Sequence, residues 1–362
     1  MKSESSSREF PGKIGVITSN ASVNSDTFKS AEGLVLKYGA DKITHALWPA
    51  NFLDERDTMT SIVASLAADR YIKALIINQA YMGSSAAVKK IKKARDDIFI
   101  VYCTIHEPLN EAAECANLML GVNDIDMGPL IVRQAKKQGA KVFVYYSFPR
   151  HLIIPSVNQC RELIRETCEK EGIRFIETFV LDPLEDSGVN TAKRYIFDSV
   201  PKYVARYGED TAFFCTNCTL QAPLIKAVTE CHAIFPQPCC PSPQHGFPEA
   251  LCNEAGKDFA DLNQLIAGIG NTAKEKNMKG RLSTWPVSAS MMFTNAAAEY
   301  SIKRMKGEVP GTGIEIKALT DIMNNYVHEA TGKAGNVNIK SHRENGVTYD
   351  NYKLVLMNYL NF

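Results

Sequence analysis

The sequence predicts an α/β protein built from two doubly wound, Rossmann-like lobes, each with a parallel sheet, joined by a hinge. One unit repeats along the chain: a short apolar run rich in β-branched residues, a polar turn, and an amphipathic helical stretch that ends at a glycine. Strands that alternate with helices pair in parallel through right-handed crossovers, with helices on both faces of the sheet. The pattern restarts near residue 123, and 362 residues are enough for two hydrophobic cores.

The first lobe is predicted to contain five strands with helices between them. Its first strand has the sequence KIGVITSN at residues 13–20, and the helix that follows ends at Gly39. Asp54 has the residue type of a helix N-cap and precedes the second helix. The remaining four strands are expected at residues 43–48, 74–78, 99–103 and 118–122.

The second lobe repeats this build. A helix at residues 124–138 ends before Gly139, and strands are expected at 141–147, 174–179 and 211–217. Pro201 lies in the helical stretch after the second of these strands, where it either kinks the helix or opens a second short one. A further helix runs to Cys231.

The last third of the chain fits the repeat less well. Residues 235–252 (FPQPCCPSPQHGFPEALC) are proline-rich and irregular, which is typical of a binding loop. Beyond them the pattern predicts helices at 259–269, 290–306 and 314–330, and strands at 281–285 and 352–359. The expected domains are a flexible leader at 1–12, an N-terminal lobe from 13–122 plus about 288–310, a C-terminal lobe at 123–287, and an extension at about 311–362 that crosses between the lobes.

Charge and composition exclude several classes of protein. Lys plus Arg number 41 against 40 for Asp plus Glu, which gives a formal net charge of +1 without blocks of one sign. This balance argues against a nucleic-acid-binding surface or an anionic membrane surface. No apolar run approaches the ~18 residues of a membrane span. The ten cysteines are too few for a disulfide scaffold, so we expect reduced thiols.

Two successive lobes of this kind, with a first strand of the form KIGVITSN, resemble the type I periplasmic binding proteins, the fold shared by sugar-binding proteins and the ligand domains of lactose-repressor relatives. Five segments are similar, more narrowly, to an uncharacterised branch of that superfamily made mostly of bacterial surface lipoproteins. They are WPANF (48–52), ALIINQA (74–80), FVYYSFPRH (143–151), YGEDTAFFCTN (207–217) and GRLSTWP (280–286).

The resemblance implies an extracytoplasmic, membrane-anchored lipoprotein. The Ser-rich, polar start MKSESSSREFPG has neither the basic start nor the apolar core of a secretory signal, and no lipid-bearing Cys, so a cytoplasmic location stays open. No helix-turn-helix precedes the first strand, so a DNA-binding repressor, or any nucleic-acid partner, is not expected in this form.

In the superfamily a small ligand is held between the lobes by loops at the carboxyl ends of the strands. The corresponding candidates are amides, hydroxyls, aromatic rings and a few charged groups, which suit directional hydrogen bonds and stacking on sugar or base rings. They are Ser19, Asn20, Trp48, Asn78, Gln79, Tyr81, His106 and Glu107 in the first lobe, Ser147, Phe148, Arg150, His151, Asp182, Thr216 and Asn217 in the second, and Trp285 at a crossover. For each polar residue the alternative is a cap on the neighbouring helix, most of all for Asn20 and Asn217.

Two local clusters allow sharper alternatives. Arg150 and His151 stand at a strand-to-helix junction, where Arg150 either pairs with a ligand carboxylate or phosphate or forms an ion pair that bridges the lobes. His106 beside Glu107 is either an acid–base pair or part of a structural loop.

A third cluster consists of cysteines. Cys215, Cys218, Cys231, Cys239 and Cys240 fall within a short stretch, and soft ligands of this kind bind zinc or act in redox chemistry. The vicinal CC pair is flanked by prolines and does not match a zinc knuckle, so structural thiols are the expectation and no metal or cofactor is assigned.

The function predicted from these observations is solute binding. The chain lacks a GxSxG elbow, an HExxH pair, a phosphate-binding P-loop and a GxGxxG after its first strand, so an enzyme is not expected. We expect a protein that captures a small polar ligand, of the sugar, nucleoside or amino-acid class, between its lobes and passes it or signals it to a membrane transporter or sensor. One alternative is an intracellular ligand-sensing module related to repressor effector domains. A third is an enzyme on the same scaffold.

Overall fold

The computed structural model describes residues 9–183, 188–252 and 261–362, and these form two compact units. Unit 1 comprises Met1–Val122, Ala289–Glu329 and Ala334–Leu356, and unit 2 comprises Asn123–Ser288, Ala330–Lys333 and Met357–Phe362. The chain therefore passes from one unit to the other more than once, and the C-terminal segments contribute to both.

Unit 1 is built on a seven-stranded sheet with the order β10-β11-β5-β4-β3-β1-β2. Its strands are β1 (Lys13–Thr18), β2 (Ile43–Leu47), β3 (Ile72–Tyr81), β4 (Phe99–His106), β5 (Leu118–Val122), β10 (Val337–Glu344) and β11 (Val347–Met357). The first five strands pair in parallel. Counted from the β2 edge, their order is β2-β1-β3-β4-β5, which is a common doubly wound order. β11 adds to the free edge of β5 in parallel, and Tyr352 pairs with Met119.

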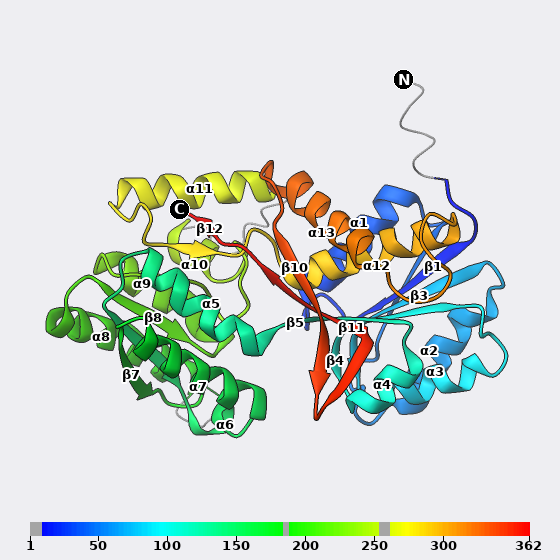
Figure 1. Ribbon diagram of the computed structural model, residues 1–362, viewed down its shortest axis with the longest axis horizontal. Helices are drawn as coiled ribbons and strands as arrows, with labels where there is room; N and C mark the ends of the chain where they lie inside the picture. Colours follow the sequence, from blue (N-terminus) through cyan, green and yellow to red (C-terminus); the bar gives the residue numbers. More distant parts are fainter. Residues whose placement is uncertain (1–8, 184–187, 253–260) are drawn as a thin grey trace. The chain divides into compact units, whose positions relative to one another are not determined.

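Helices cover both faces of this sheet. They are α1 (Ser25–Tyr38), α2 (Arg56–Ala68), α3 (Ser84–Lys92), α4 (Leu109–Cys115), α12 (Ala289–Met305) and α13 (Ile316–Thr331). Within unit 1, α1 and α12 pack together on one face, whereas α2, α3 and α4 lie on the other (Figure 1). Beneath α2 to α4, apolar residues such as Met59, Val63 and Tyr102 form a continuous buried core.

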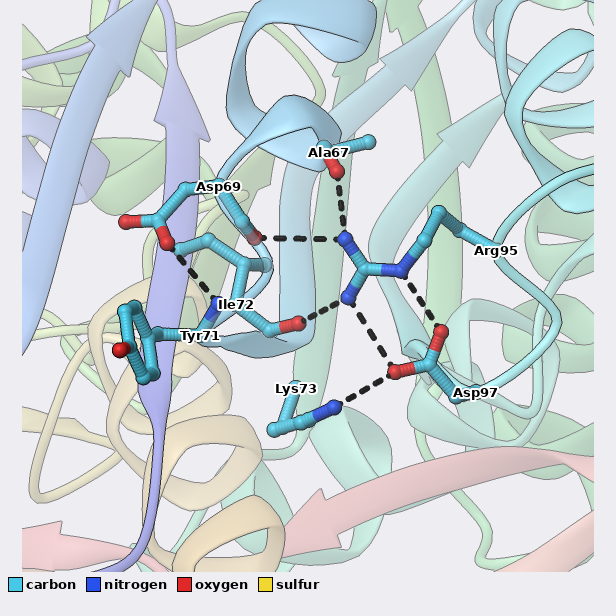
Figure 2. Close-up of polar contacts among 7 residues, drawn as sticks. All are labelled: Ala67, Asp69, Tyr71, Ile72, Lys73, Arg95 and Asp97. Carbon is cyan, nitrogen blue, oxygen red and sulfur yellow. Dashed lines mark hydrogen bonds and ion pairs between the residues drawn. The ribbon is translucent and has the colours of Figure 1, made fainter.

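Arg95 fastens the amino-terminal edge of the unit 1 sheet (Figure 2). Its guanidinium donates to the backbone carbonyls of Ala67, Asp69 and Ile72, which lie at the end of α2 and the start of β3. It also makes a forked contact with the Asp97 carboxylate, with Nε 2.7 Å from Oδ1 and Nη2 3.2 Å from Oδ2. Lys73 Nζ lies 2.8 Å from Oδ2 of the same carboxylate. One planar fork therefore joins a helix end, a strand start and the loop before β4.

Unit 2 is built on a three-stranded parallel sheet with the order β7-β6-β8. Its strands are β6 (Val142–Ser147), β7 (Arg174–Phe179) and β8 (Thr211–Cys215), and a separate antiparallel pair joins β9 (Ser283–Thr284) to β12 (Leu360–Asn361). Isolated bridges from Ala212 to Ile234 and from Phe235 to Leu282 continue the sheet beyond β8.

The helices of unit 2 are α5 (Asp124–Lys137), α6 (Pro149–Leu152), α7 (Pro155–Lys170), α8 (Gly188–Tyr207), the 3-10 turn η1 (Cys218–Leu220), α9 (Gln221–Glu230), α10 (Phe247–Leu251) and α11 (Leu262–Glu275). α5 packs on α7, while α8, α9, α10 and α11 form a second contiguous group. Both units are therefore layered α/β structures with parallel sheets, and the predicted fold class is confirmed.

Some predicted elements differ in their bounds. Pro201 lies inside one continuous helix, α8, rather than at the start of a second helix. The strand expected at 281–285 is reduced to β9, and the aromatic strand at the end of the chain begins earlier, at Val347. Most of the expected leader lies outside the described residues, as does the start of the helix expected at 259–269; Phe10 is buried and packs edge-on against Tyr38. Among the described residues, we find no helix with the length and apolar character that crossing a bilayer requires.

Candidate functional site

Three predicted residues meet at the carboxyl edge of the unit 1 sheet. Gln79 Oε1 accepts a hydrogen bond from Ser19 Oγ at 3.0 Å and another from Tyr81 OH at 2.9 Å. The two hydroxyl oxygens, of Ser19 and Tyr81, are themselves 3.1 Å apart. The ends of β1 and β3 thus hold an amide and two hydroxyls in one hydrogen-bonded group, which is a ready set of donors and acceptors for a polar ligand.

A stack of rings adjoins this group. The ring of Tyr81 lies on Phe52 with centroids 3.8 Å apart and an interplanar angle of 10°, and it also stacks with His106 at 5.4 Å and 19°. Phe52 comes from the loop after β2, and His106 is exposed at the end of β4. The loop after β2 and the ends of the neighbouring strands β3 and β4 thus each contribute one ring to this group.

Trp48 and Asn78 are more deeply placed. Trp48 is 3% exposed within the core under α2 and α3, and its indole Nε1 has no hydrogen-bond partner among the described residues. Asn78 is fully buried; its Oδ1 accepts from Thr294 Oγ1 at 3.1 Å, while its Nδ2 has no partner in the part of the chain that the structure describes. Their role as ligand contacts stays a prediction, and in the structure both are core residues with unused donors.

The side chains of Asn20 and Glu107 accept hydrogen bonds from nearby residues of the chain. Asn20 Oδ1 accepts from Ser22 Oγ at 2.8 Å and from Val23 N at 3.0 Å, so it closes the turn before α1. Both carboxylate oxygens of Glu107 accept from Ser85 N, at 3.1 and 3.2 Å, at the start of α3. Burial raises the pKa of Glu107. Glu107 binds the start of α3 while His106 stacks on Tyr81, so these contacts do not pair the two side chains as acid and base.

Unit 2 brings together a second polar group at the carboxyl edge of its own sheet. Thr216 Oγ1, just past β8, lies 3.2 Å from Ser147 Oγ at the end of β6 and 2.9 Å from His151 Nδ1 on α6. The ring of His151 packs on Phe148 with centroids 4.1 Å apart. Burial of the ring, followed by the nearby charge of Arg150, lowers the pKa of His151, so it is neutral at pH 7.

Arg150 already has an anionic partner. Its Nε lies 2.6 Å and its Nη2 2.9 Å from the two carboxylate oxygens of Asp182, a bidentate pair within unit 2. The Asp182 side chain is 9% exposed and the Arg150 side chain 45%. Neither of the two sequence-based alternatives for Arg150 described this partner.

Three further predicted residues have structural contacts. Phe148 is fully buried in the unit 2 core, and Asn217 Oδ1 accepts from Thr219 N at 2.9 Å to cap η1. Trp285 is fully buried as well, and its Nε1 has no hydrogen-bond partner among the residues the structure describes. Their assignment to a ligand site stays a prediction.

The cysteine cluster is divided by the fold. Cys215 is buried in β8 and Cys231 packs against the core, whereas Cys218, Cys239 and Cys240 converge with a residue outside the predicted set, His245. Cys218 Sγ is 3.5 Å from Cys239 Sγ and 3.7 Å from Cys240 Sγ, and Cys239 Sγ is 3.7 Å from His245 Nε2. All ten thiols are free. The shared hydrogen bonds lower the pKa of Cys218 and raise the pKa of Cys239 and Cys240.

Phe52 and His245 were missed by sequence reasoning. Phe52 stands in the segment WPANF directly after a strand, and an aromatic residue at that place was a usable signal. His245 follows the CC pair within the same proline-rich stretch, so the spacing of metal ligands was visible although the partner Cys218 lies more than twenty residues earlier.

Comparison with known proteins places the chain in a family. The model of a family described as a protein of unknown function, DUF3798, matches residues 12–283. The chain belongs to this family. Two relatives, both described as uncharacterized proteins of Treponema pallidum (strain Nichols), are 30% identical over 164 residues and 28% identical over 176 residues. These matches cover 45% and 47% of this chain and 76% and 80% of the relatives.

Solved structures identify the fold of this DUF3798 protein. A candidate transcriptional regulator from Clostridium difficile 630 has a TM-score of 0.86 at 20% identity, with 98% of this chain and all of that chain covered. A sugar ABC transporter protein from Actinomyces odontolyticus ATCC 17982 has a TM-score of 0.53 at 10% identity, covering 84% and 86% of the two chains. A substrate-binding protein of a sugar ABC transport system from Bordetella parapertussis 12822 has a TM-score of 0.51 at 10% identity, covering 97% and 89%. The fold is that of the type I periplasmic binding proteins.

Proposed function

We propose that this protein is a solute-binding protein that closes its two lobes on a small polar ligand and presents it to a membrane transporter or sensor. One observation carries the proposal: in each unit, polar and aromatic side chains meet at the carboxyl edge of the sheet. They are Ser19, Gln79 and Tyr81 in unit 1 and Ser147, His151 and Thr216 in unit 2. Ligands of open α/β sheets bind at that edge. The fold shared with two sugar-transport proteins supports the same role.

The chemistry of these groups favours a neutral ligand that carries a ring. The stack of Phe52, Tyr81 and His106 suits the apolar face of a sugar or a base. Amide, hydroxyl and neutral imidazole groups suit hydroxyls of the ligand. Arg150 is neutralised by Asp182, so it does not present a free positive charge to a ligand carboxylate. We therefore place sugars and nucleosides ahead of organic acids.

Ligand binding would drive closure through a population shift. Contacts that both lobes make to one ligand exist only when the lobes are closed, so binding favours the closed state by the free energy of those contacts. A transporter or sensor that recognises the closed state then reads ligand occupancy. On this proposal the protein works outside the cytoplasm, and no catalytic step is assigned to it.

The second candidate is a ligand-sensing module that acts inside the cell. The observation in its favour is the similarity over nearly the whole chain to the candidate regulator from Clostridium difficile. Ten free thiols also fit a reducing compartment. Cell fractionation separates the two candidates, because a transport protein is recovered with the membrane or the cell exterior and a sensing module with the cytosol.

A thermal-shift screen tests the proposed site directly. The full chain is melted with panels of sugars, nucleosides, amino acids and organic acids, and a specific ligand raises the midpoint by mass action. The Tyr81→Ala variant is expected to lose that shift. Tyr71→Ala is the matched control, because Tyr71 directly precedes the same strand at its opposite end and is 51% exposed. An unchanged shift in Tyr81→Ala, or an equal loss in Tyr71→Ala, would contradict the assignment.

A further inference from the structure

We propose that Cys218, Cys239, Cys240 and His245 bind one zinc ion in unit 2. The ligand atoms of these four residues all lie within 4.8 Å of one another. Three thiols and an imidazole form one of the ligand sets that hold structural zinc. The site is independent of the solute-binding proposal, since it requires none of the contacts of Tyr81, Gln79 or Ser19.

The spacing of the atoms matches a tetrahedral metal. Zinc–sulfur bonds of about 2.3 Å at tetrahedral angles place two sulfurs about 3.8 Å apart. Cys218 Sγ lies 3.5 and 3.7 Å from the other two sulfurs, and Cys239 Sγ lies 3.7 Å from His245 Nε2. A disulfide needs its two sulfurs about 2.05 Å apart, so these pairs stand at a distance suited to a shared ion rather than to a covalent bond.

The fold holds the two ligand-bearing segments next to each other. Cys218 opens η1 directly after Asn217, whose side chain caps that turn, so its position is fixed by β8 and α9. Cys239, Cys240 and His245 stand on the segment that precedes α10. His245 N also donates to Ser242 O at 3.2 Å, which closes a turn inside that segment.

Both ends of this segment are anchored. At one end Gln237 is fully buried, and its Oε1 accepts from Tyr359 OH. At the other end Gly246, with φ of 83°, lets the backbone pass close to α9. A Cβ on Gly246 would lie 2.8 Å from Gln221 Cβ and 3.2 Å from Ala222 N, so only glycine permits this approach. The residue beside that glycine is His245.

The donor set selects the ion and its role. Thiolate sulfur favours zinc and other soft ions over magnesium or calcium, and four protein ligands leave no open position for substrate. The site is therefore structural. Two of the ligand residues, Cys218 and Cys240, are exposed, so the site lies near the surface of the unit.

Zinc at this place would stiffen the edge that carries the candidate ligand contacts. Thr216, which bonds Ser147 and His151, is two residues before Cys218. An ion that ties Cys218 to the segment before α10 restrains the loop after β8 from one side. We expect the metal-loaded protein to melt at a higher temperature than the metal-free protein, because the unfolded chain lacks a preformed site.

Metal analysis of the full chain tests the proposal. The protein is reduced, stripped with a chelator, reloaded with zinc, and measured by native mass spectrometry and elemental analysis; about one zinc per chain is expected. Cys239→Ser and His245→Gln are expected to lose most of the bound zinc. Cys231→Ser is the matched control, because Cys231 is in the same unit but outside the cluster, and it should retain zinc.

Cobalt provides a readout that does not depend on the variants folding. Cobalt added to the metal-free wild-type protein should give thiolate-to-metal absorption and the visible bands of a tetrahedral ion, and zinc should bleach both. Absence of these bands, zinc that remains bound in both Cys239→Ser and His245→Gln, or equal zinc loss in Cys231→Ser would overturn the proposal. The proposal would also be overturned if the intact protein were lighter by two hydrogen atoms and peptide mapping placed a disulfide between two of Cys218, Cys239 and Cys240.

Discussion

Gln79 in β3 and Thr104 in β4 occupy matching positions of neighbouring parallel strands, and both have left-handed backbone conformations, with φ angles of 52° and 57°. The register on either side is regular, with Asn78 opposite Cys103 and Ala80 opposite Ile105. A β-branched residue rarely adopts such an angle, and strained residues of this kind gather at functional sites. This paired distortion lies two residues before Tyr81 and His106, which pair with each other across the two strands and whose rings stack.

The strain at Thr104 predicts an unusual response to glycine. Thr104→Gly should change the free energy of unfolding by less than about 1 kcal/mol, because relief of the left-handed conformation offsets the flexibility that glycine adds to the unfolded chain. Thr44→Gly is the control, as Thr44 lies in β2 of the same sheet with comparable exposure and should lose roughly 1 kcal/mol or more. Urea unfolding measures both. Equal losses would show that Thr104 is not strained.

The Tyr81 hydroxyl and ring should contribute separately to ligand binding. Tyr81→Phe keeps the stack with Phe52 but removes the hydrogen bonds to Ser19 and Gln79, so affinity for the ligand found by screening should fall by about fivefold, or ~1 kcal/mol. Tyr81→Ala should weaken binding further, since the stack is lost as well. Isothermal titration distinguishes the two. If Tyr81→Phe bound the ligand more weakly than Tyr81→Ala, the result would be inconsistent with this arrangement.

We expect Arg150 to contribute more to the stability of the protein than to the binding of a charged ligand. Arg150→Ala leaves the poorly exposed Asp182 carboxylate without its bidentate partner, so the melting midpoint should fall, and sugars and nucleosides should still bind. Arg165→Ala is the control, because Arg165 is an exposed partner of Glu162 on α7 and such pairs contribute little. If Arg150→Ala melts like the wild type and abolishes binding of an anionic ligand, Arg150 is a ligand contact instead.

The Arg95 fork should be important for folding of unit 1. Arg95→Ala removes the donor shared by the carbonyls of Ala67 and Ile72, with an expected cost of about 1–3 kcal/mol in the free energy of unfolding. Arg95→Lys should recover only part of it, because an ammonium group cannot reproduce the planar fork. A full recovery in Arg95→Lys would mean that charge alone matters at this position.

Asp97, which belongs to the same cluster, should make the stability of the protein depend on pH. Hydrogen bonds from Arg95 and Lys73 hold the pKa of Asp97 well below its usual value. A carboxyl whose pKa is lowered by folding stabilises the protein above its unfolded pKa of about 3.9, and the stabilisation disappears as the pH falls through the lower folded value. The difference in midpoint between wild type and Asp97→Asn should therefore be largest near neutral pH and shrink below about pH 4, moderated by the partial exposure of the side chain. A difference in midpoint that grows in acid would mean that folding does not lower the pKa of Asp97.

Much of the fold could be predicted because its elements are local. The apolar runs from β1 to β5 and the helices between them have clear periods, and the carboxyl-edge rule led to Ser19, Gln79 and Tyr81. The pairing of β11 with β5 could not be predicted, because it joins segments more than two hundred residues apart. The hairpin from β10 to β11 had a local signal that was overlooked: Asn345 and Gly346 both have positive φ, as a tight two-residue turn requires.

In the candidate site, too, local contacts could be predicted from the sequence and contacts between distant segments could not. Helix capping was visible in the sequence as an alternative for Asn20 and Asn217, since short polar side chains before helices commonly serve this purpose. Asn217 does cap η1, whereas Asn20 closes the turn before α1, whose N-cap is Asn24. The pairing of Arg150 with Asp182 and the meeting of His245 with Cys218 depend on how distant loops fold back on one sheet edge. The spacing of residues along the chain does not predict such contacts.

Solute binding can be measured by native mass spectrometry of the purified full chain, compared with the same sample after denaturation. We expect the folded protein to retain a noncovalent small molecule, or to acquire one per chain from a mixture of sugars and nucleosides, and to release it intact on unfolding. We also expect that Tyr81→Ala fails to retain this molecule and that Tyr71→Ala retains it. A folded protein that binds no member of the mixture, or that returns the molecule chemically altered, would contradict solute binding as its function.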